Sequence, residues 1–383
     1  MFKKFLCSIL FLIFFSISNF SENAWGKFST IDTYFYNPIV LNVNELLVLG
    51  GYDSFKNKPV SAKIYNLDTK SFMDTHSVMS IPRISYNSIQ IDKNKILVFG
   101  GQPKHKDYRG LFTKTAEIFD LNTKKFRRIG DTNFIHIKPS IILLDDGRIF
   151  INSQDKPEIF NPKTETFSIV GRKKEEILYA FGDKKKPMKF SFYTLNHYSQ
   201  STAVKLQDGK ILIVGGFPYE NFYNDKYCDK NNRYYNKNFN AEIYDPKANN
   251  FIKIGQMNRQ CLSCTATLLP DGTVLIAGGK GRERAEVFSP KTNTFFETGK
   301  MKQPRYNHSS ILLSTGSVLI IGGIYGEDKG MKYVKVAELY NSKTKKFRKV
   351  GFTKEVYPSS KMQVIDKNRI IITNSKISEI YKY

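Results

Sequence analysis

The chain has 383 residues, of which 41% are hydrophobic and 14% aromatic, so it can bury a large core and is not a wholly disordered protein. Its formal net charge of +24 indicates either an anionic partner, such as a polysaccharide or a membrane surface, or lysines spread over surface loops. The sequence contains no nucleic-acid-binding motif, and no nucleic-acid partner is expected.

The N-terminus has the pattern of an export signal. Lys3 and Lys4 precede an apolar run, Phe5 to Ile17, which is too short to span a bilayer comfortably. We therefore expect a signal peptide over residues 1–18, cleaved before Asn19, with Ala24 as a second candidate for the cleavage site, and a periplasmic or secreted protein. An uncleaved membrane anchor is the alternative interpretation of the same segment.

Beyond this segment the chain repeats one phrase: a turn, a buried strand, a glycine pair, and a further strand with an acidic residue near its start. In the clearest copy Asp271 and Gly272 form the turn, and Glu286 marks the further strand. Neighbouring copies lie 44 to 63 residues apart, and each holds several short strand signals, which is typical of propeller blades. The glycines expected to shape this scaffold are Gly50, Gly51, Gly100, Gly101, Gly215, Gly216, Gly278, Gly279, Gly322 and Gly323.

The repeated residues resemble those of the kelch-repeat family, in its bacterial, galactose-oxidase-like branch. The marks of the family are the glycine pair, an acidic–aliphatic–aromatic third strand such as Glu286 to Phe288, and an aromatic fourth strand. This chain has Phe295 and its equivalents where the family usually has Trp. The resemblance implies an all-β, seven-bladed β-propeller over residues 25–383. The expected blades are residues 33–75, 82–128, 135–169, 197–253, 261–297, 305–349, and 357–383 plus 27–32.

The seventh copy lacks a fourth strand of its own. Kelch propellers often close by pairing strands from the two termini, which removes a free sheet edge. The segment Lys27–Ile31 has the pattern of a fourth strand and belongs to no other blade. We therefore expect residues 27–32 to complete the last blade beside Ile377–Tyr381.

The ligand site is expected on one face of the propeller. The loop between the second and third strands of a blade emerges beside the loop to the next blade, and the long segments 102–115, 171–196, 217–240 and 324–336 all belong to that face. Variable loops on a rigid scaffold usually carry binding, so we place the site there and at the channel mouth. Packing of the loop aromatics on the rim is the alternative. The candidate residues are Arg83, His197, Tyr219, Tyr223, Tyr227, Tyr234, Arg259, Arg305 and His308.

Two of these candidates recur at one position of the repeat. Arg83 and Arg305 precede an innermost strand, and His308 follows Arg305 by three residues. In kelch repeats this pattern mainly serves packing and loop hydrogen bonds, so a structural role is the alternative to ligand contact. The third-strand carboxylate recurs in six copies, which predicts an architectural role. These residues are Glu117, Glu158, Glu242, Glu286, Glu338 and Glu379.

Three cysteines follow the signal peptide. Aligning the turns of the fifth and sixth copies places Cys261 where Arg305 stands and Cys264 where His308 stands. We expect a disulfide between Cys228 and one of these two, with one thiol left free. No second Cys-x-x-Cys motif or paired histidine accompanies them, so no zinc site is expected.

These patterns favour a binding protein over an enzyme. The leading prediction is an exported monomer whose loop-rich face binds a protein or an anionic surface glycan, without a cofactor or metal ion. Because the chain carries a net positive charge, contact with a membrane surface is a further expectation. The alternative is a sugar-modifying enzyme that resembles the periplasmic kelch sialic-acid mutarotases. A copper oxidase resembling galactose oxidase uses two His and two Tyr ligands; only Tyr306 and His308 resemble such a pair, so this activity and any catalytic residue are not assigned.

Overall fold

The structure, a computed structural model, describes residues 25–27, 38–53, 57–103, 111–153, 156–171, 174–179, 187–192, 198–199, 201–218, 241–259, 261–279, 283–326, 330–353, 360–373 and 378–383. These residues form seven four-stranded and five two-stranded antiparallel sheets. Within them no helix is long and apolar enough to cross a membrane. The predicted signal peptide lies outside the described residues.

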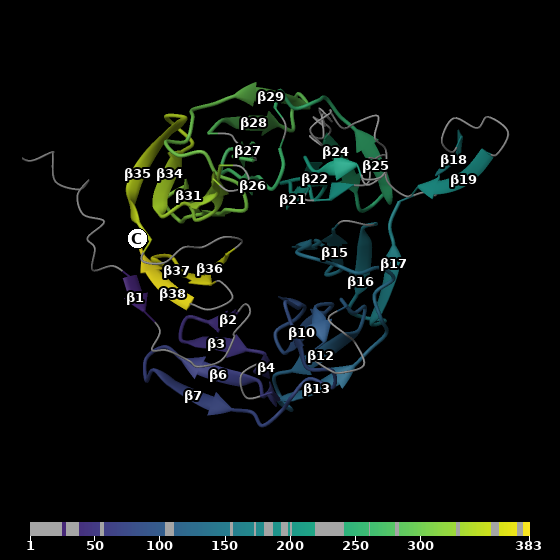
Figure 1. The fold of residues 1–383 in the computed structure, drawn as a ribbon, viewed down its shortest axis with the longest axis vertical. Helices are drawn as coiled ribbons and strands as arrows, with labels where there is room; N and C mark the ends of the chain where they lie inside the picture. Colours follow the sequence, from purple (N-terminus) through teal and green to yellow (C-terminus); the bar gives the residue numbers. More distant parts are fainter. Residues whose placement is uncertain are drawn as a thin grey trace, which may run out of the picture.

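The seven larger sheets stand side by side around a central channel, as the blades of a β-propeller (Figure 1). From blade 3 round to blade 1, the first strands of neighbouring blades contact each other around this channel. The all-β, seven-bladed architecture predicted from the repeats is therefore confirmed. From blade 1 to blade 7 the strands are β2 (Ile39–Asn42), β3 (Glu45–Val48), β6 (Lys63–Asn66), β7 (Ser71–Asp74); β9 (Asn87–Gln90), β10 (Lys95–Phe99), β12 (Ala116–Asp120), β13 (Lys125–Arg128); β14 (Ser140–Leu143), β15 (Ile149–Asn152), β16 (Glu158–Asn161), β17 (Thr166–Ile169); β21 (Thr202–Lys205), β22 (Ile211–Val214), β24 (Ala241–Asp245), β25 (Asn250–Lys253); β26 (Thr265–Leu268), β27 (Val274–Ala277), β28 (Ala285–Ser289), β29 (Thr294–Glu297); β30 (Ser309–Leu312), β31 (Ser317–Ile321), β34 (Val336–Asn341), β35 (Lys346–Phe352); and β36 (Lys361–Asp366), β37 (Arg369–Thr373), β38 (Ser378–Lys382), β1 (Trp25–Lys27).

The core lies between the blades. Side chains of a strand alternate between its two faces, so a strand covered by a blade on each side must be apolar throughout. In β27, Val274 and Ile276 pack against blade 4, whereas Leu275 packs against blade 6. This arrangement explains why the second strand of each repeat is a continuous apolar run.

A pair of aromatic rings joins the third and fourth strands of six blades. Phe288 and Phe295 face each other across β28 and β29, with ring centroids 4.9 Å apart. Such pairs contribute about 0.5–1.5 kcal/mol beyond the area that they bury. The repeated Phe therefore fills the fourth-strand position expected for it. The other pairs are Tyr65–Phe72, Phe119–Phe126, Phe160–Phe167, Tyr244–Phe251 and Tyr340–Phe347.

The glycine pairs allow one blade to approach the backbone of the next. Gly278 has a φ of +71°, and a Cβ at this position would lie 2.5 Å from the carbonyl oxygen of Arg305. The amide of Gly279 donates a hydrogen bond to the same oxygen over 3.0 Å. The amide of Gly216 donates in the same way to the carbonyl of Cys261. Both the positive φ and the close approach favour glycine.

The last blade is closed by a strand from the N-terminal part of the chain. β1 pairs antiparallel with β38, and the Cα of Gly26 lies opposite that of Ile380. This confirms closure by an N-terminal strand. The strand begins at Trp25, earlier than the predicted segment 27–32, and residues 28–37 lie outside the described residues.

Deleting residues 25–27 is expected to lower the melting temperature by several degrees. The deletion removes the hydrogen-bonding partner of β38 and exposes that strand as a free edge. Thermal unfolding followed by circular dichroism measures the effect. Deleting residues 19–21, upstream of β1, is the control, and equal melting temperatures for both deletions would contradict the closure.

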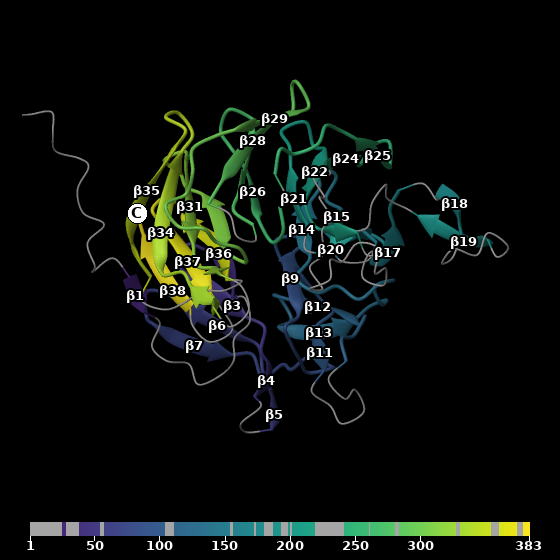
Figure 2. The ribbon, with the colours of Figure 1, turned by 45° about the horizontal axis from the view of Figure 1, so that its top comes forward.

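The two ends of the propeller differ. Tight turns occupy one end, whereas accessory two-stranded sheets extend from the other, where the second strands of the blades finish. In Figure 2, β4, β5 and β11 project from the same side of the ring. The accessory pairs are β4 (Gly51–Asp53) with β5 (Lys58–Val60), β8 (Arg83–Ile84) with β11 (Gln102–Pro103), β18 (Lys174–Tyr179) with β19 (Pro187–Phe192), β20 (Tyr198–Ser199) with β23 (Phe217–Pro218), and β32 (Ile324–Tyr325) with β33 (Lys332–Tyr333).

Candidate functional site

The two arginines predicted to contact a ligand are buried inside their blades. Arg83 and Arg305 are both 0% exposed. Nη2 of Arg83 lies 2.5 Å from Oε1 of Glu117, and Nη2 of Arg305 lies 2.8 Å from Oε1 of Glu338. Each guanidinium also donates to backbone carbonyls, among them Thr115 and Val336. Neither arginine side chain is open to solvent, so neither can contact a ligand as predicted. Their role is structural.

The third-strand carboxylates hold the loops that lead into the blades. Oε2 of Glu117 accepts a hydrogen bond from the amide of Ser80 (2.8 Å), and Oε2 of Glu338 accepts one from the amide of Lys302 (2.6 Å). In blade 3, Glu158 has His136 in place of an arginine, at 2.8 Å. The predicted architectural role of these carboxylates is confirmed in these blades.

Blade 5 departs from this plan. The hydrogen bond from Gly216 to Cys261 matches that from Gly279 to Arg305, so Cys261 occupies the position of the arginine. Glu286 is 4% exposed and accepts a hydrogen bond from the amide of Asn258, but its Oε1 has no hydrogen-bond partner among the residues that the structure describes. Burial raises the pKa of Glu286 to about 7.

The cysteine pairing differs from the prediction. Cys261 and Cys264 form a disulfide with each other, with their Cα atoms 5.4 Å apart. Ser263 between them has a φ of +51°, and this left-handed turn brings two neighbours in sequence within bonding range. The expected bond from Cys228 to one of them is therefore wrong. Cys228 itself lies outside the described residues.

The remaining candidates divide into two groups. His308 lines the channel, and its Nε2 lies 3.0 Å from Oγ1 of Thr265. Burial, together with the charge of Arg305, lowers the pKa of His308 to about 3, so this side chain is neutral at physiological pH. Arg259 pairs with Glu297 at 2.6 Å and does not line the channel. The candidates His197, Tyr219, Tyr223, Tyr227 and Tyr234 lie outside the described residues.

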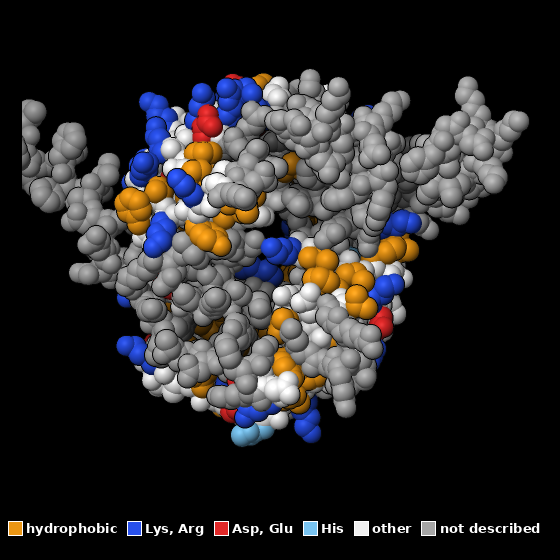
Figure 3. Space-filling model, viewed as in Figure 1, with side chains coloured by type: hydrophobic (Ala, Val, Ile, Leu, Met, Phe, Trp, Pro, Cys, Tyr) orange, Lys and Arg blue, Asp and Glu red, His pale blue; other side chains and the backbone are white. Residues whose placement is uncertain are grey.

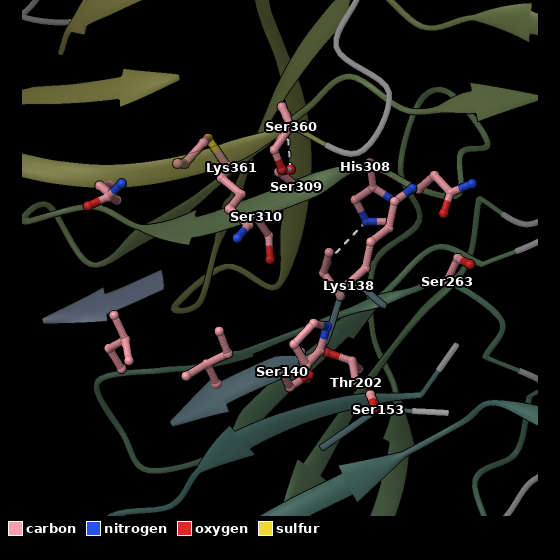
Figure 4. Close-up of a pocket in the computed structure, with 18 of the residues that line it drawn as sticks. Lys138, Ser140, Ser153, Thr202, Ser263, His308, Ser309, Ser310, Ser360 and Lys361 are labelled. Carbon is pink, nitrogen blue, oxygen red and sulfur yellow. Dashed lines mark hydrogen bonds between the residues drawn. The ribbon is translucent and has the colours of Figure 1, made fainter. Parts of the chain in front are cut away.

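The channel holds an open cavity of about 1140 Å³ where the innermost strands begin. Lys and Arg side chains are visible in the central opening in Figure 3. Among the described residues that line the cavity, the charged ones are Lys138 and Lys361, and no Asp or Glu is present. Figure 4 shows these two lysines among hydroxyl side chains. The hydroxyl residues are Ser88, Ser140, Ser153, Ser201, Thr202, Ser263, Thr265, Ser309, Ser310 and Ser360.

No pattern in the sequence marks the two lysines of the cavity lining. Lys138 precedes β14 and Lys361 begins β36, and neither belongs to a repeated motif. Runs such as Ser309-Ser310 and Ser201-Thr202 at the start of innermost strands do mark the hydroxyl lining, and this signal was available from the sequence. The channel mouth was the expected place of the site. Of the predicted candidates that the structure describes, His308 lines the cavity, whereas Arg83, Arg259 and Arg305 do not.

Of the comparisons with known proteins, the one with solved structures found a match, and it shows the fold alone. No protein-family model matches the sequence, and no curated protein matches it. A solved structure described as a novel fungal alcohol oxidase of the AA5 family, in complex with copper, aligns with a TM-score of 0.62. The alignment has 12% sequence identity and covers 94% of this chain and 76% of that chain. The chain is thus a seven-bladed β-propeller, and its membership of the kelch family stays a prediction.

The described residues do not fit a copper centre. They contain no group of three or more His, Cys, Asp or Glu side chains arranged to hold a metal ion. The hydroxyl of Tyr306 donates to Sδ of Met331, whereas His308 faces Thr265. The two residues that resemble a ligand pair therefore have separate partners, and no reaction step is derived through copper.

Proposed function

We propose that this chain is an exported binding protein that holds a surface glycan at the loop-rich end of its propeller. The difference between the two ends supports the proposal, because accessory two-stranded sheets extend from the end at which the channel opens, while the opposite end has tight turns. Rigid scaffolds commonly present their binding residues in this way. The export signal rests on residues 1–18 of the sequence.

The accessory sheet of blade 6 offers a contact surface for sugar rings. Tyr333 in β33 is 59% exposed, and Met331 beside it is 55% exposed. The hydroxyl of Tyr306 donates to Sδ of Met331 over 3.4 Å, which ties this surface to the start of the innermost strand. The exposed ring of Tyr333, which follows the exposed Lys332 in the sequence, combines apolar stacking with hydrogen bonding.

The mature chain is expected to bind a defined subset of surface glycans on an array. Tyr333→Ala should weaken this binding about 5- to 30-fold, because losing an aromatic anchor costs about 1–2 kcal/mol. Phe296→Ala is the matched control: Phe296 is 53% exposed on the outer strand β29, far from the channel, so binding should not change. A protein recovered by pull-down without any glycan hit would overturn the proposal, as would acceleration of sialic-acid mutarotation.

A further inference from the structure

The turn that carries the disulfide of blade 5 belongs to the repeat and does not need a bond between sulfur atoms. Ser263 stands two residues after Cys261 and has a φ of +51°. The residues two positions after Arg83, His136 and Arg305 adopt the same left-handed conformation, with φ values of +53°, +48° and +52°. They are Ser85, Lys138 and Asn307, and their three turns contain no cysteine. In blade 5 the disulfide is therefore added to a turn that other blades form without it.

Hydrogen bonds from both neighbouring blades hold the backbone of this turn. The amide of Gly216 in blade 4 donates to the carbonyl of Cys261 over 3.0 Å, and the amide of Asn307 in blade 6 donates to the carbonyl of Ser263 over 3.0 Å. A disulfide stabilises a fold mainly by restricting the unfolded chain, and this effect is smallest when the closed loop is short, as between residues 261 and 264. Reduction of the bond should thus leave the turn in place and the propeller folded.

The two sulfur atoms have different surroundings. Cys264 lines the open cavity of the channel, together with its neighbours Ser263 and Thr265, and is 7% exposed. Cys261 does not line this cavity and is 3% exposed. Its Sγ would lie 2.8 Å from a Cβ placed on Gly215, so blade 4 covers this sulfur closely. A molecule in the channel therefore meets the disulfide at Cys264.

We propose that Cys261–Cys264 is a redox-active disulfide that exchanges with a low-molecular-weight thiol entering the channel, and that Cys264 is the sulfur attacked. The cavity, of about 1140 Å³, has room for a thiol of the size of a tripeptide. This activity is independent of the proposed glycan binding.

The exchange takes place in two steps. The thiolate of the entering molecule forms a bond to Sγ of Cys264, while the bond between the two cysteine sulfurs breaks and its electron pair goes to Sγ of Cys261. The proton lost by the entering thiol is balanced by the one that Cys261 takes up, since burial in apolar surroundings favours the neutral thiol. A second thiol molecule attacks the mixed disulfide, is released as the oxidised small molecule, and leaves Cys264 reduced.

Reaction of the folded mature chain with an excess of reduced glutathione tests the proposal. All variants carry Cys228→Ser, because Cys228 is the remaining cysteine after the signal peptide. Acid quenching, alkylation of free thiols and mass spectrometry measure the reduced fraction. We expect most of the chain to be reduced without denaturant, with an unchanged circular dichroism spectrum and a melting temperature lowered by only a few degrees.

Single-cysteine variants test which sulfur faces the channel. With oxidised glutathione, Cys261→Ser is expected to form the mixed disulfide at Cys264 about 10-fold faster than Cys264→Ser forms it at Cys261, because blade 4 covers Cys261. The same reaction in urea is the control, since unfolding exposes both sulfurs and should make the two rates equal. Circular dichroism shows whether each variant is folded. If one is not, fragmentation of the peptide that spans both cysteines, after partial reduction of the Cys228→Ser chain, shows which sulfur carries glutathione.

Two results would overturn the proposal. A disulfide that resists glutathione in the folded chain and is reduced only in urea has a structural role alone. Equal rates for the two single-cysteine variants in the folded state, or glutathione found on Cys261 in the chain that has both cysteines, would show that the channel does not lead to Cys264. Neither result bears on glycan binding, which the array measures separately.

Discussion

Replacing Arg305 with methionine is expected to lower the free energy of unfolding by about 3–5 kcal/mol. The guanidinium is fully buried and lies 2.8 Å from Glu338, so its removal leaves a buried carboxylate without its counter-charge. The variant also loses the hydrogen bonds from the guanidinium to the carbonyls of Gly322 and Val336. Methionine is of similar length and apolar, so the cavity left behind is small.

Urea unfolding followed by circular dichroism measures this loss. Arg127→Met is the matched control: Arg127 lies 2.6 Å from Glu165, but its side chain is 56% exposed, so its ion pair is worth less than about 1 kcal/mol. The double variant Arg305→Met, Glu338→Leu should recover part of the stability, because it leaves no buried charge. Equal effects of Arg305→Met and Arg127→Met would show that burial does not decide the strength of the pair.

The repeats made the scaffold predictable. Each structural residue occurs several times at the same position, as the glycine pairs and the third-strand Glu do, so one copy can be interpreted with the help of the others. The same comparison placed Cys261 at the position of Arg305, and the shared hydrogen bond to the preceding glycine pair confirms it. Repetition identifies what every blade needs in order to pack.

The residues of the channel mouth could not be found in this way. Lys138 and Lys361 stand at positions that are not lysine in every repeat, and they are far apart in the sequence. Closure of the ring brings both to one cavity. The cysteine pairing failed for a local reason, since the left-handed turn at Ser263 brings Cys261 close to Cys264. The spacing of residues in the sequence shows neither which strands meet when the ring closes nor the sign of φ at a single residue.

Blade 5 shows what the missing arginine costs. Glu286 occupies the position of Glu338 in blade 5. Cys261, at the position of Arg305, is part of a disulfide and cannot donate a hydrogen bond to the carboxylate of Glu286. Burial is the largest cause and raises the pKa of Glu286 to about 7. Of the nearby charges, Arg259 lowers the pKa of Glu286 and Glu297 raises it. The difference from the ordinary value of 4.5 corresponds to ~3 kcal/mol. Since the folded state holds the proton more tightly, this carboxyl group opposes folding least below pH 4.5 and most above pH 7.

Glu286→Gln is therefore expected to stabilise the protein at pH 8 by about 1–3 kcal/mol and to have little effect at pH 5. Glutamine keeps the shape and the acceptor for the amide of Asn258 but carries no charge at either pH. Glu338→Gln is the matched control, because the same substitution there removes the counter-charge of Arg305 and should destabilise the protein at both pH values. Melting temperatures of both variants and the wild type at pH 5 and pH 8 decide the matter. A Glu286→Gln variant that is less stable than the wild type at pH 8 would mean that this carboxylate has a cationic partner after all, and that blade 5 follows the plan of the others.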